Sequence, residues 1–426
     1  MSGKIVNNVF RASGVIAATP GGLDWSTAVV TGSTLTATAG KGYFINTTSN
    51  ACTVTLPSSA EIGDQIVFAD YARTWSTNNL IIDSNGNNFQ GDPDTYTVDY
   101  STAGQSLNIV YSDATKGWLP VSDDAVAFNH TAPRTQNGIF GYGATNADPS
   151  YVSLTNLINS SGVIAADVTG VGTPTSTLAA ASYGGDKAIF AYGDQTGNGY
   201  VNVKHLVNNS GVVAAVSSGA GTAKYALSAA GYGTDKAIFG YGSNNSYLTA
   251  SNLVTNEGVI GSDNAISGTG RFFGAAVGYG DDKAIFGFGR NASGRIGFTN
   301  LVSNSGVVAA DVTRVGTARN NLAATTYGSS GQALFAYGYT GSANTAVKNL
   351  ISNSGVVASD VSGVGTARQA LAATSYGGDK GAFAYGSAGA TQYSLKNLVS
   401  NSGVIAADVT GVGTARIYLA AAAYGY

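Results

Sequence analysis

Apolar residues recur along the last two thirds of the chain in two short phrases, which alternate with polar, glycine-rich stretches. One phrase is an apolar segment ending in Phe-x-Tyr-Gly, and the other is Leu-Ala-Ala-x-x-Tyr-Gly in its fullest form. The phenylalanines of the first phrase are Phe140, Phe190, Phe239, Phe286 (with Phe288 in place of the tyrosine), Phe335 and Phe383. The last tyrosines of the second phrase are Tyr183, Tyr232, Tyr279, Tyr327, Tyr376 and Tyr424. Each phrase returns after about 50 residues, which indicates a repeat protein.

Each repeat predicts four short strands. In residues 178–216, a strand of small residues at 178–183 precedes a Gly-Gly-Asp turn and an apolar strand at 187–192. A polar stretch leads to a third strand at 201–207, and an Asn-Asn-Ser-Gly turn leads to a fourth at 212–215. Four antiparallel strands in about 50 residues are typical of one blade of a β-propeller.

The two ends of the repeat region complement each other. The first Phe phrase has no Leu-Ala-Ala phrase before it, and the last Leu-Ala-Ala phrase has no Phe phrase after it. The sequence therefore predicts a six-bladed propeller over residues 138–426, closed by a split blade. In that blade, Leu419–Tyr424 supply the inner strand and residues 138–168 the outer three. A linear solenoid is the alternative, but its ends need not match in this way.

The first part of the chain differs in pattern. Segments such as Cys52-Thr-Val-Thr-Leu and Gln65-Ile-Val-Phe-Ala alternate apolar and polar residues, as strands do. They predict a β-sandwich or jelly-roll-like module over residues 38–124. Residues 125–137 are expected to be a linker. Residues 1–37 are expected to be a partner-docking segment or an extra hairpin, because part of the segment resembles the outer hairpin of a repeat.

Composition narrows the function classes. Only 11% of the 426 residues are charged and the net charge is −3, so no basic surface for nucleic acid is expected. No apolar run is long enough to cross a bilayer, and the N-terminus lacks the apolar core of a signal peptide. Cys52 is the single cysteine, which excludes a disulfide framework.

Candidate catalytic chemistry is sparse. His130 and His205 are the only histidines and have no metal-ligand spacing, and neither a His-Glu-x-x-His nor a Gly-x-Ser-x-Gly motif occurs. The Gly-Val-Gly-Thr segments at Gly170, Gly363 and Gly411 lack the lysine of a phosphate loop and are interpreted as turns. The sequence predicts a protein that is not an enzyme and has no metal site and no cofactor.

Charged residues recur at fixed positions in the repeats. A cation precedes the small-residue strand in five of them, at Lys224, Arg271, Arg319, Arg368 and Arg416. Aspartates follow the fourth strand at Asp167, Asp311, Asp360 and Asp408. Because repetition indicates scaffold, we expect a structural ring of ion pairs that joins the repeats. A ring of arginines facing an anionic sugar is the alternative.

The stretches between the second and third strands differ from one repeat to the next, so they are the expected site of recognition. Tyrosine among Asn, Gly, Ser and Thr suits polar recognition around a flat aromatic group. The candidate ligand-binding residues are Tyr151, Tyr200, Tyr247, Arg295, Tyr339 and Tyr393. The alternative is that these loops are polar only because they lie in water.

Two resemblances accompany these patterns. Residues 138–426 resemble kelch-type propellers, as in Thr317-Ala-Arg, Leu322-Ala-Ala, Tyr327-Gly and Ala333-Leu-Phe-Ala-Tyr-Gly. They differ from the kelch pattern because they lack its glycine doublet after the second strand and its tryptophan in the fourth strand. Residues 38–120 resemble a β module of tail-fibre and related virion proteins from marine and cyanobacterial phages, as in Gly42-Tyr-Phe-Ile-Asn-Thr-Thr and Asp113-Ala-Thr-Lys-Gly-Trp.

The phage resemblance implies a virion protein that is assembled in the host cytoplasm and acts outside the cell. Residues 1–124 would attach to other virion proteins, and the propeller would display its loops to a host-surface glycan or protein. A purely structural virion subunit and, less favoured, a glycan-active enzyme are the alternatives. No membrane insertion is expected, and a homo-oligomer is left open.

Overall fold

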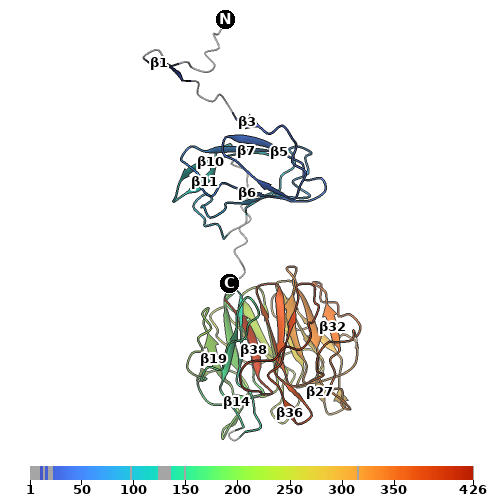
Figure 1. Ribbon diagram of the computed structural model, residues 1–426. Coiled ribbons are helices and arrows are strands. Elements are labelled where there is room, and N and C mark those ends of the chain that lie inside the picture. Colours follow the sequence, from blue (N-terminus) through green and yellow to red (C-terminus); the bar gives the residue numbers. More distant parts are fainter. Residues whose placement is uncertain are drawn as a thin grey trace. The chain divides into compact units, whose positions relative to one another are not determined.

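The computed structural model describes residues 10–12, 15–17, 23–95, 98–122, 136–147, 150–313 and 316–425. These residues form strands, turns and irregular segments without a helix, which confirms the all-β class (Figure 1). The chain divides into two compact units, Met1–Pro133 and Arg134–Tyr426. The predicted linker lies outside the described residues, apart from 136 and 137, and so does His130.

Unit 1 contains two sheets around one core. The first has the order β11-β10-β7-β5-β3 and the second the order β4-β6-β8-β9. Their strands are β3 (Asp24–Trp25), β4 (Thr34–Thr36), β5 (Lys41–Ile45), β6 (Cys52–Thr55), β7 (Gln65–Asp70), β8 (Leu80–Asp83), β9 (Val98–Tyr100), β10 (Ser106–Asp113) and β11 (Gly117–Pro120). Buried residues of both sheets, Trp118 among them, form a single hydrophobic cluster with Trp75, which lies in a turn between β7 and β8. A separate hairpin pairs β1 (Phe10–Ala12) with β2 (Val15–Ala17).

The sequence predicts a β-sandwich or jelly-roll-like module, and of these two arrangements the jelly roll is wrong for this unit. A jelly roll is antiparallel, whereas β3 and β5, β5 and β7, β4 and β6, and β6 and β8 are parallel neighbours. From β3 to β8 the chain passes from one sheet to the other at every step, so each strand returns beside an earlier one in the same direction. Apolar residues alternate in the same way in parallel and antiparallel strands with one buried face, and the sequence pattern therefore does not indicate the direction of the strands.

Besides three small sheets of two-residue strands, the described residues of unit 2 form six similar sheets. Five of them begin with a small-residue strand, an apolar strand and a third strand: β15 (Ala179–Tyr183), β16 (Lys187–Ala191) and β19 (Val203–Val207); β21 (Ser228–Tyr232), β22 (Lys236–Gly240) and β23 (Ala250–Val254); β25 (Ala275–Tyr279), β26 (Lys283–Gly287) and β29 (Thr299–Val302); β30 (Ala323–Tyr327), β31 (Gln332–Ala336) and β32 (Lys348–Ile351); β33 (Ala372–Tyr376), β34 (Lys380–Ala384) and β37 (Lys396–Val399). The sixth sheet joins the two ends of the unit, since β12 (Asn137–Gly141) lies between β13 (Thr155–Ile158) and β38 (Ala420–Tyr424).

The six small-residue strands contact one another in chain order, and β38 also contacts β15, the first of them. The small side chains allow this close approach, and Ala180, Ala229, Ala276, Ala324, Ala373 and Ala421 line a pocket of about 90 Å³ among the strands. Neighbouring sheets share hydrophobic clusters, so that Phe190 of one sheet packs with Ala422 and Tyr424 of another. Each sheet therefore buries its faces against its neighbours.

The fourth strand is shorter than predicted. It is a two-residue strand in two sheets, β20 (Ser217–Ser218) and β24 (Asn264–Ala265), and β20 lies after the predicted residues 212–215, which hold only the bridge of Val213 with Val207. Elsewhere it is reduced to single bridges such as Thr155 with Val168 and Ile158 with Ile164. Between those two bridges the side-chain amide of Asn156 donates to the Ala165 carbonyl, so a side chain replaces part of the backbone ladder.

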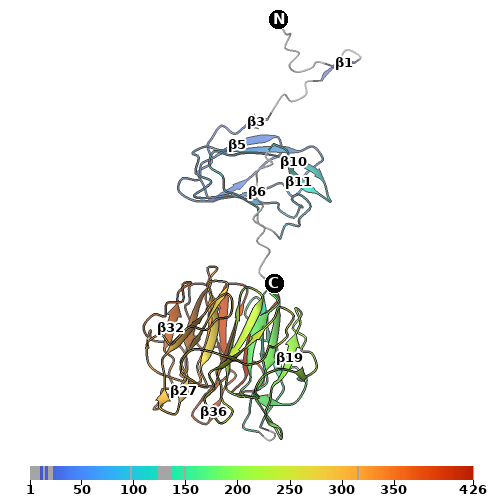
Figure 2. The same ribbon diagram turned by 180° about the vertical axis from the view of Figure 1, so that it is seen from behind.

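Two sides of unit 2 are distinguished by their connections. The loop face carries the variable stretches that join the second and third strands, and the turn face carries the glycine-rich turns between the first and second strands. In both views the hairpin strands β27 (Arg290–Asn291) and β36 (Thr391–Gln392) lie together at one end of the unit (Figure 1, Figure 2). The Gly-Val-Gly-Thr segments are connectors, and a Cβ at Gly411 would lie 1.1 Å from the Ser394 carbonyl oxygen.

Candidate functional site

Six residues with unusual backbone conformation surround a pocket on the loop face. Each lies two residues before a small-residue strand and has a positive φ between 52° and 56°. They are Thr177, Ala226, Phe273, Asn321, Ala370 and Tyr418. We call them the axial residues. None is glycine, and a left-handed conformation costs a residue with a side chain about 1 kcal/mol or more.

A cycle of hydrogen bonds holds this conformation. The backbone N–H of each axial residue donates to the carbonyl of the axial residue in the preceding repeat, at 2.8 to 3.0 Å. Thr177 donates to Tyr418, Ala226 to Thr177, Phe273 to Ala226, Asn321 to Phe273, Ala370 to Asn321 and Tyr418 to Ala370. The cycle returns to its starting residue. The six backbones are thereby fixed relative to one another, and the side chains that they carry surround one small space.

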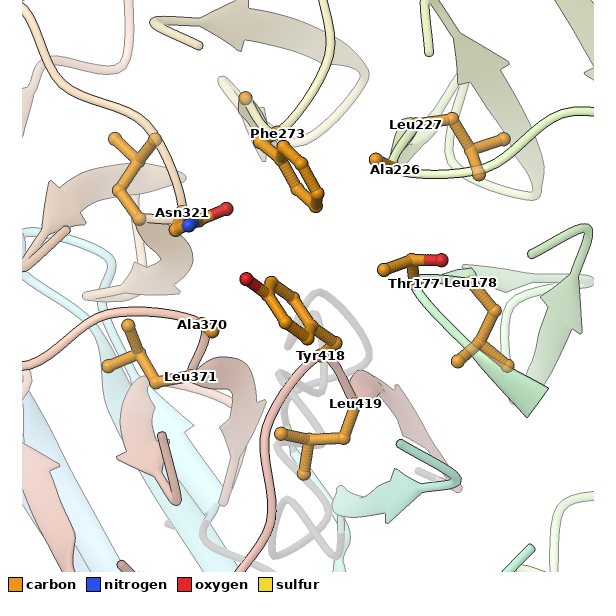
Figure 3. Close-up of a pocket in the computed structure, with 12 residues that line it drawn as sticks. Thr177, Leu178, Ala226, Leu227, Phe273, Asn321, Ala370, Leu371, Tyr418 and Leu419 are labelled. Carbon is orange, nitrogen blue, oxygen red and sulfur yellow. The ribbon is translucent and has the colours of Figure 1, made fainter. Parts of the chain in front are cut away.

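The pocket has a volume of about 100 Å³. Phe273 and Tyr418 face each other across it, with ring centroids 5.5 Å apart, and Asn321 lies beside them (Figure 3). Asn321 donates from Nδ2 to Gln369 Oε1 at 2.9 Å, and its buried Oδ1 has no hydrogen-bond partner within the described parts of the chain. Burial raises the pKa of Tyr418, an effect that its hydrogen bond with Asn321 opposes, so the phenol is neutral at physiological pH. The pocket is thus lined by apolar ring surface and adjoins one buried acceptor, Asn321 Oδ1.

A second ring of residues connects the pocket to the loops. The residue before each axial residue pairs with the first residue of a variable loop. These second-ring residues are Ser176, Tyr225, Phe272, Asn320, Gln369 and Ile417, and their partners are Asp194, Ser243, Arg290, Tyr339, Ser387 and Ala144. The pocket and the loops are consequently one continuous surface.

The residues of both rings differ from repeat to repeat, whereas the positions on either side of them are nearly constant. The position before the second ring is Lys or Arg in five repeats, and the position after the axial residue is Leu in five repeats. Between these two positions lie the second-ring residue and the axial residue. Over the six repeats, the second ring contains six residue types and the axial ring contains five. Within one chain, therefore, the scaffold is repeated while the surface around the pocket is diversified.

Aromatic rings form a continuous sector of this surface. Tyr200 stacks on Tyr225 with centroids 4.4 Å apart. Phe272 lies 6.2 Å from Tyr225, 5.6 Å from Tyr247 and 4.7 Å from Phe273, which reaches Tyr418 in the pocket. The sector extends from the loop hairpins to the pocket.

The structure places the six predicted ligand-binding residues on the same face, but only some of them together. Tyr200 and Tyr247 belong to the aromatic sector, and Tyr247 is 40% exposed. Arg295 lies over the Tyr339 ring at 4.9 Å.

The remaining two are separate from this group. Tyr151 donates to Asp194 Oδ2 at 2.7 Å, and burial together with that carboxylate raises its pKa to about 12. Tyr393 is half-buried in its own hairpin, where its backbone N–H donates to the Gly386 carbonyl. The axial and second rings were not among the predicted site residues, although both positions stand out as variable when the repeats are aligned with one another.

The five recurring cations lie inside unit 2. Lys224, Arg271, Arg319, Arg368 and Arg416 are each at most 2% exposed and hydrogen-bond to an asparagine at 2.5 to 2.7 Å. Each lies 3.7 to 3.9 Å from an aspartate and 3.9 to 4.9 Å from an aromatic ring centroid of the preceding repeat. Burial lowers the pKa of Lys224 to about 8. The alternative that these cations face an external anionic sugar is wrong, because they are enclosed by protein.

One repeat has lost this arrangement as a whole. Thr175 stands at the cation position, His205 at the asparagine position and Val216 at the aspartate position. His205 is buried, which lowers its pKa, and its ring lies 5.2 Å from that of Tyr142. The three residues change together, which indicates that cation, asparagine and aspartate act as one structural unit.

No group of three or more His, Cys, Asp or Glu side chains that could hold a metal ion occurs in the described ranges. Within the same ranges no helix is suited to span a membrane. The sequence matches no protein-family model and no curated protein. The repeats, the two rings and the loops are therefore the basis for inferring a function.

Proposed function

We propose that unit 2 is a six-bladed, kelch-like β-propeller closed by a split blade. Two observations support this architecture. The small-residue strands contact one another in an order that returns from β38 to β15. The hydrogen bonds of the axial residues return to Thr177 in the same order. In this arrangement β38 is the inner strand of the blade whose outer strands are β12 and β13.

We further propose that the chain is a phage virion protein, a tail fibre or appendage, whose loop face binds a receptor on the host surface without catalysis. The observation that carries this proposal is the diversification of the two rings within a repeated scaffold. Binding surfaces on rigid frames vary where the frame does not. The aromatic sector and the polar groups around it are of the type that recognises sugars or polar protein surfaces.

In this proposal unit 1 attaches to other virion proteins, as its resemblance to phage fibre modules implies. A purely structural subunit without a receptor of its own is the second candidate. The receptor-binding proposal is preferred because a structural role gives no reason for such varied residues at two equivalent positions of every repeat.

The test is binding of purified fragments 1–133 and 134–426 to candidate host bacteria. We expect saturable binding by 134–426, at least about tenfold above that of 1–133, because the loop face belongs entirely to the second fragment. Fluorescently labelled fragments and flow cytometry give the binding curves. Circular dichroism first establishes that each fragment is folded. Absence of binding by 134–426 and by the full chain would favour the structural subunit.

A further inference from the structure

One loop hairpin places two arginines directly opposite each other. Arg290 in β27 pairs with Arg295 in β28 (Gly294–Arg295). Like charges at directly opposed positions of an antiparallel pair are unfavourable. Among the ion pairs of the described residues, none includes either arginine. Nε of Arg290 is buried and has no hydrogen-bond partner in the described part of the chain. Two arginines on neighbouring strands of this hairpin are therefore left without an ion pair in the described part of the chain.

The two guanidinium groups are held in place by aromatic rings. Arg290 lies 5.3 Å from the centroid of Phe272, and Arg295 lies 4.9 Å from that of Tyr339. Arg295 also donates from Nε to Asn320 Oδ1 at 3.2 Å. Both side chains are half-buried. A cation oriented in this way loses little freedom on binding an anion.

This arrangement is peculiar to one repeat. The residues that correspond to Arg290 in the other repeats are Ala144, Asp194, Ser243, Tyr339 and Ser387. The paired cations also adjoin the aromatic sector, because Phe272 contacts Tyr247 and Phe273 as well as Arg290. Positive charge and exposed ring surface thus meet at one place on the loop face.

We propose that this place binds an anionic saccharide. Arg290 and Arg295 receive its acid group through charge-assisted hydrogen bonds, for which the guanidinium fork is suited to both carboxylate and phosphate. The sugar ring lies against Phe272 and Tyr247. The inference specifies the ligand class of the proposed receptor-binding face and rests on that proposal. Its chemistry is shared by sugars that carry a carboxylate and by phosphorylated surface polymers.

The test compares binding of the full chain to immobilised polygalacturonate, polysialic acid, teichoic acid and neutral dextran. We expect the parent to bind at least one acidic polymer more tightly than dextran and to lose affinity as salt is raised, because screening weakens exposed charge interactions. Preference for the carboxylate polymers or for teichoic acid assigns the acid group, and either preference supports the proposal.

The decisive variant is the double substitution Arg290→Gln/Arg295→Gln. It is expected to lower affinity for the acidic polymer at least tenfold while the thermal transition of unit 2 stays that of the parent. Lys236→Gln/Lys283→Gln is the matched control, because it removes the same charge from the turn face, where both lysines pair with neighbouring aspartates. The control is expected to bind as the parent does.

Undiminished acidic-polymer binding by the arginine variant, an equal loss in the control, or a parent that binds no acidic polymer in the panel would overturn the inference. Host-cell binding separates this failure from failure of the receptor role. If the parent binds host cells and the arginine variant binds them equally well, the receptor role stands and the anionic ligand is wrong. If the parent binds no host cells, the receptor role itself fails.

Discussion

Removal of residues 417–426 is expected to unfold all of unit 2 rather than one repeat. The deletion removes β38, which pairs with β12 over five residue pairs and contacts β15 and β33. It also removes Tyr418, which both donates and accepts in the cycle of axial hydrogen bonds. Because the buried side chains of Ala420, Ala422 and Tyr424 are lost, two neighbouring sheets are left uncovered. We expect a loss of about 5 kcal/mol or more, comparable to the whole stability of many domains.

The two units can be followed separately in this experiment. All three tryptophans lie in unit 1, so tryptophan fluorescence reports on that unit, whereas near-ultraviolet circular dichroism also contains the many tyrosines of unit 2. Deletion of Gly425 and Tyr426 alone keeps β38 and is the control, expected to unfold close to the parent. A 417–426 deletion that retains the parent's tyrosine signal and its unfolding transition would contradict the ring of contacts.

Arg319→Met is expected to destabilise unit 2 by about 3 to 5 kcal/mol, the usual cost of removing one member of a buried ion pair. Arg319 is fully buried and donates to the carbonyls of Tyr337 and Thr317 and to Asn349 Oδ1. Methionine fills a similar volume but leaves these three acceptors unpartnered, and Asp360 loses the cation 3.9 Å away. Urea unfolding followed by circular dichroism measures the change.

Arg295→Met is the matched control, because it removes the same charge from a half-buried side chain outside the ion pairs of the described residues. It is expected to change the free energy of unfolding by less than about 1 kcal/mol. Equal effects of the two substitutions would show that the recurring cations are not structural.

The repeats could be predicted from the sequence because the residues that mark them lie close together along the chain. The small residues before Tyr183 and its equivalents, and the unmatched phrases at either end of the repeat region, mark the strands and anticipate the pairing of β38 with β12. The outer edge was less accessible, because the side chain of Asn156 takes the place of backbone pairing there. The direction of strands in unit 1 was not accessible either, since buried Cys52 and Val54 alternate with half-buried residues as they would in an antiparallel sheet.

The candidate site was predicted in its outer part only. Variable loops with Tyr200 and Tyr247 stand out in the sequence, whereas the axial pocket depends on positive φ at residues such as Phe273 and Tyr418. Glycine and asparagine usually mark that conformation, and these bulky residues do not. The cycle of hydrogen bonds that stabilises this conformation joins residues far apart in the chain, so no local sequence pattern predicts the conformation.

The most direct test of the receptor role is to block each face in turn on the full-length chain. Ser293→Cys lies at an exposed position in the loop hairpin between β27 and β28, and Ser305→Cys lies in an exposed turn on the opposite side of the same repeat. Cys52, the natural cysteine, is fully buried and does not compete for a maleimide polymer. Polymer coupled at residue 293 is expected to abolish binding to host bacteria, while polymer coupled at residue 305 is expected to leave binding intact. Loss of binding only from position 305, or equal binding by both conjugates, would contradict it.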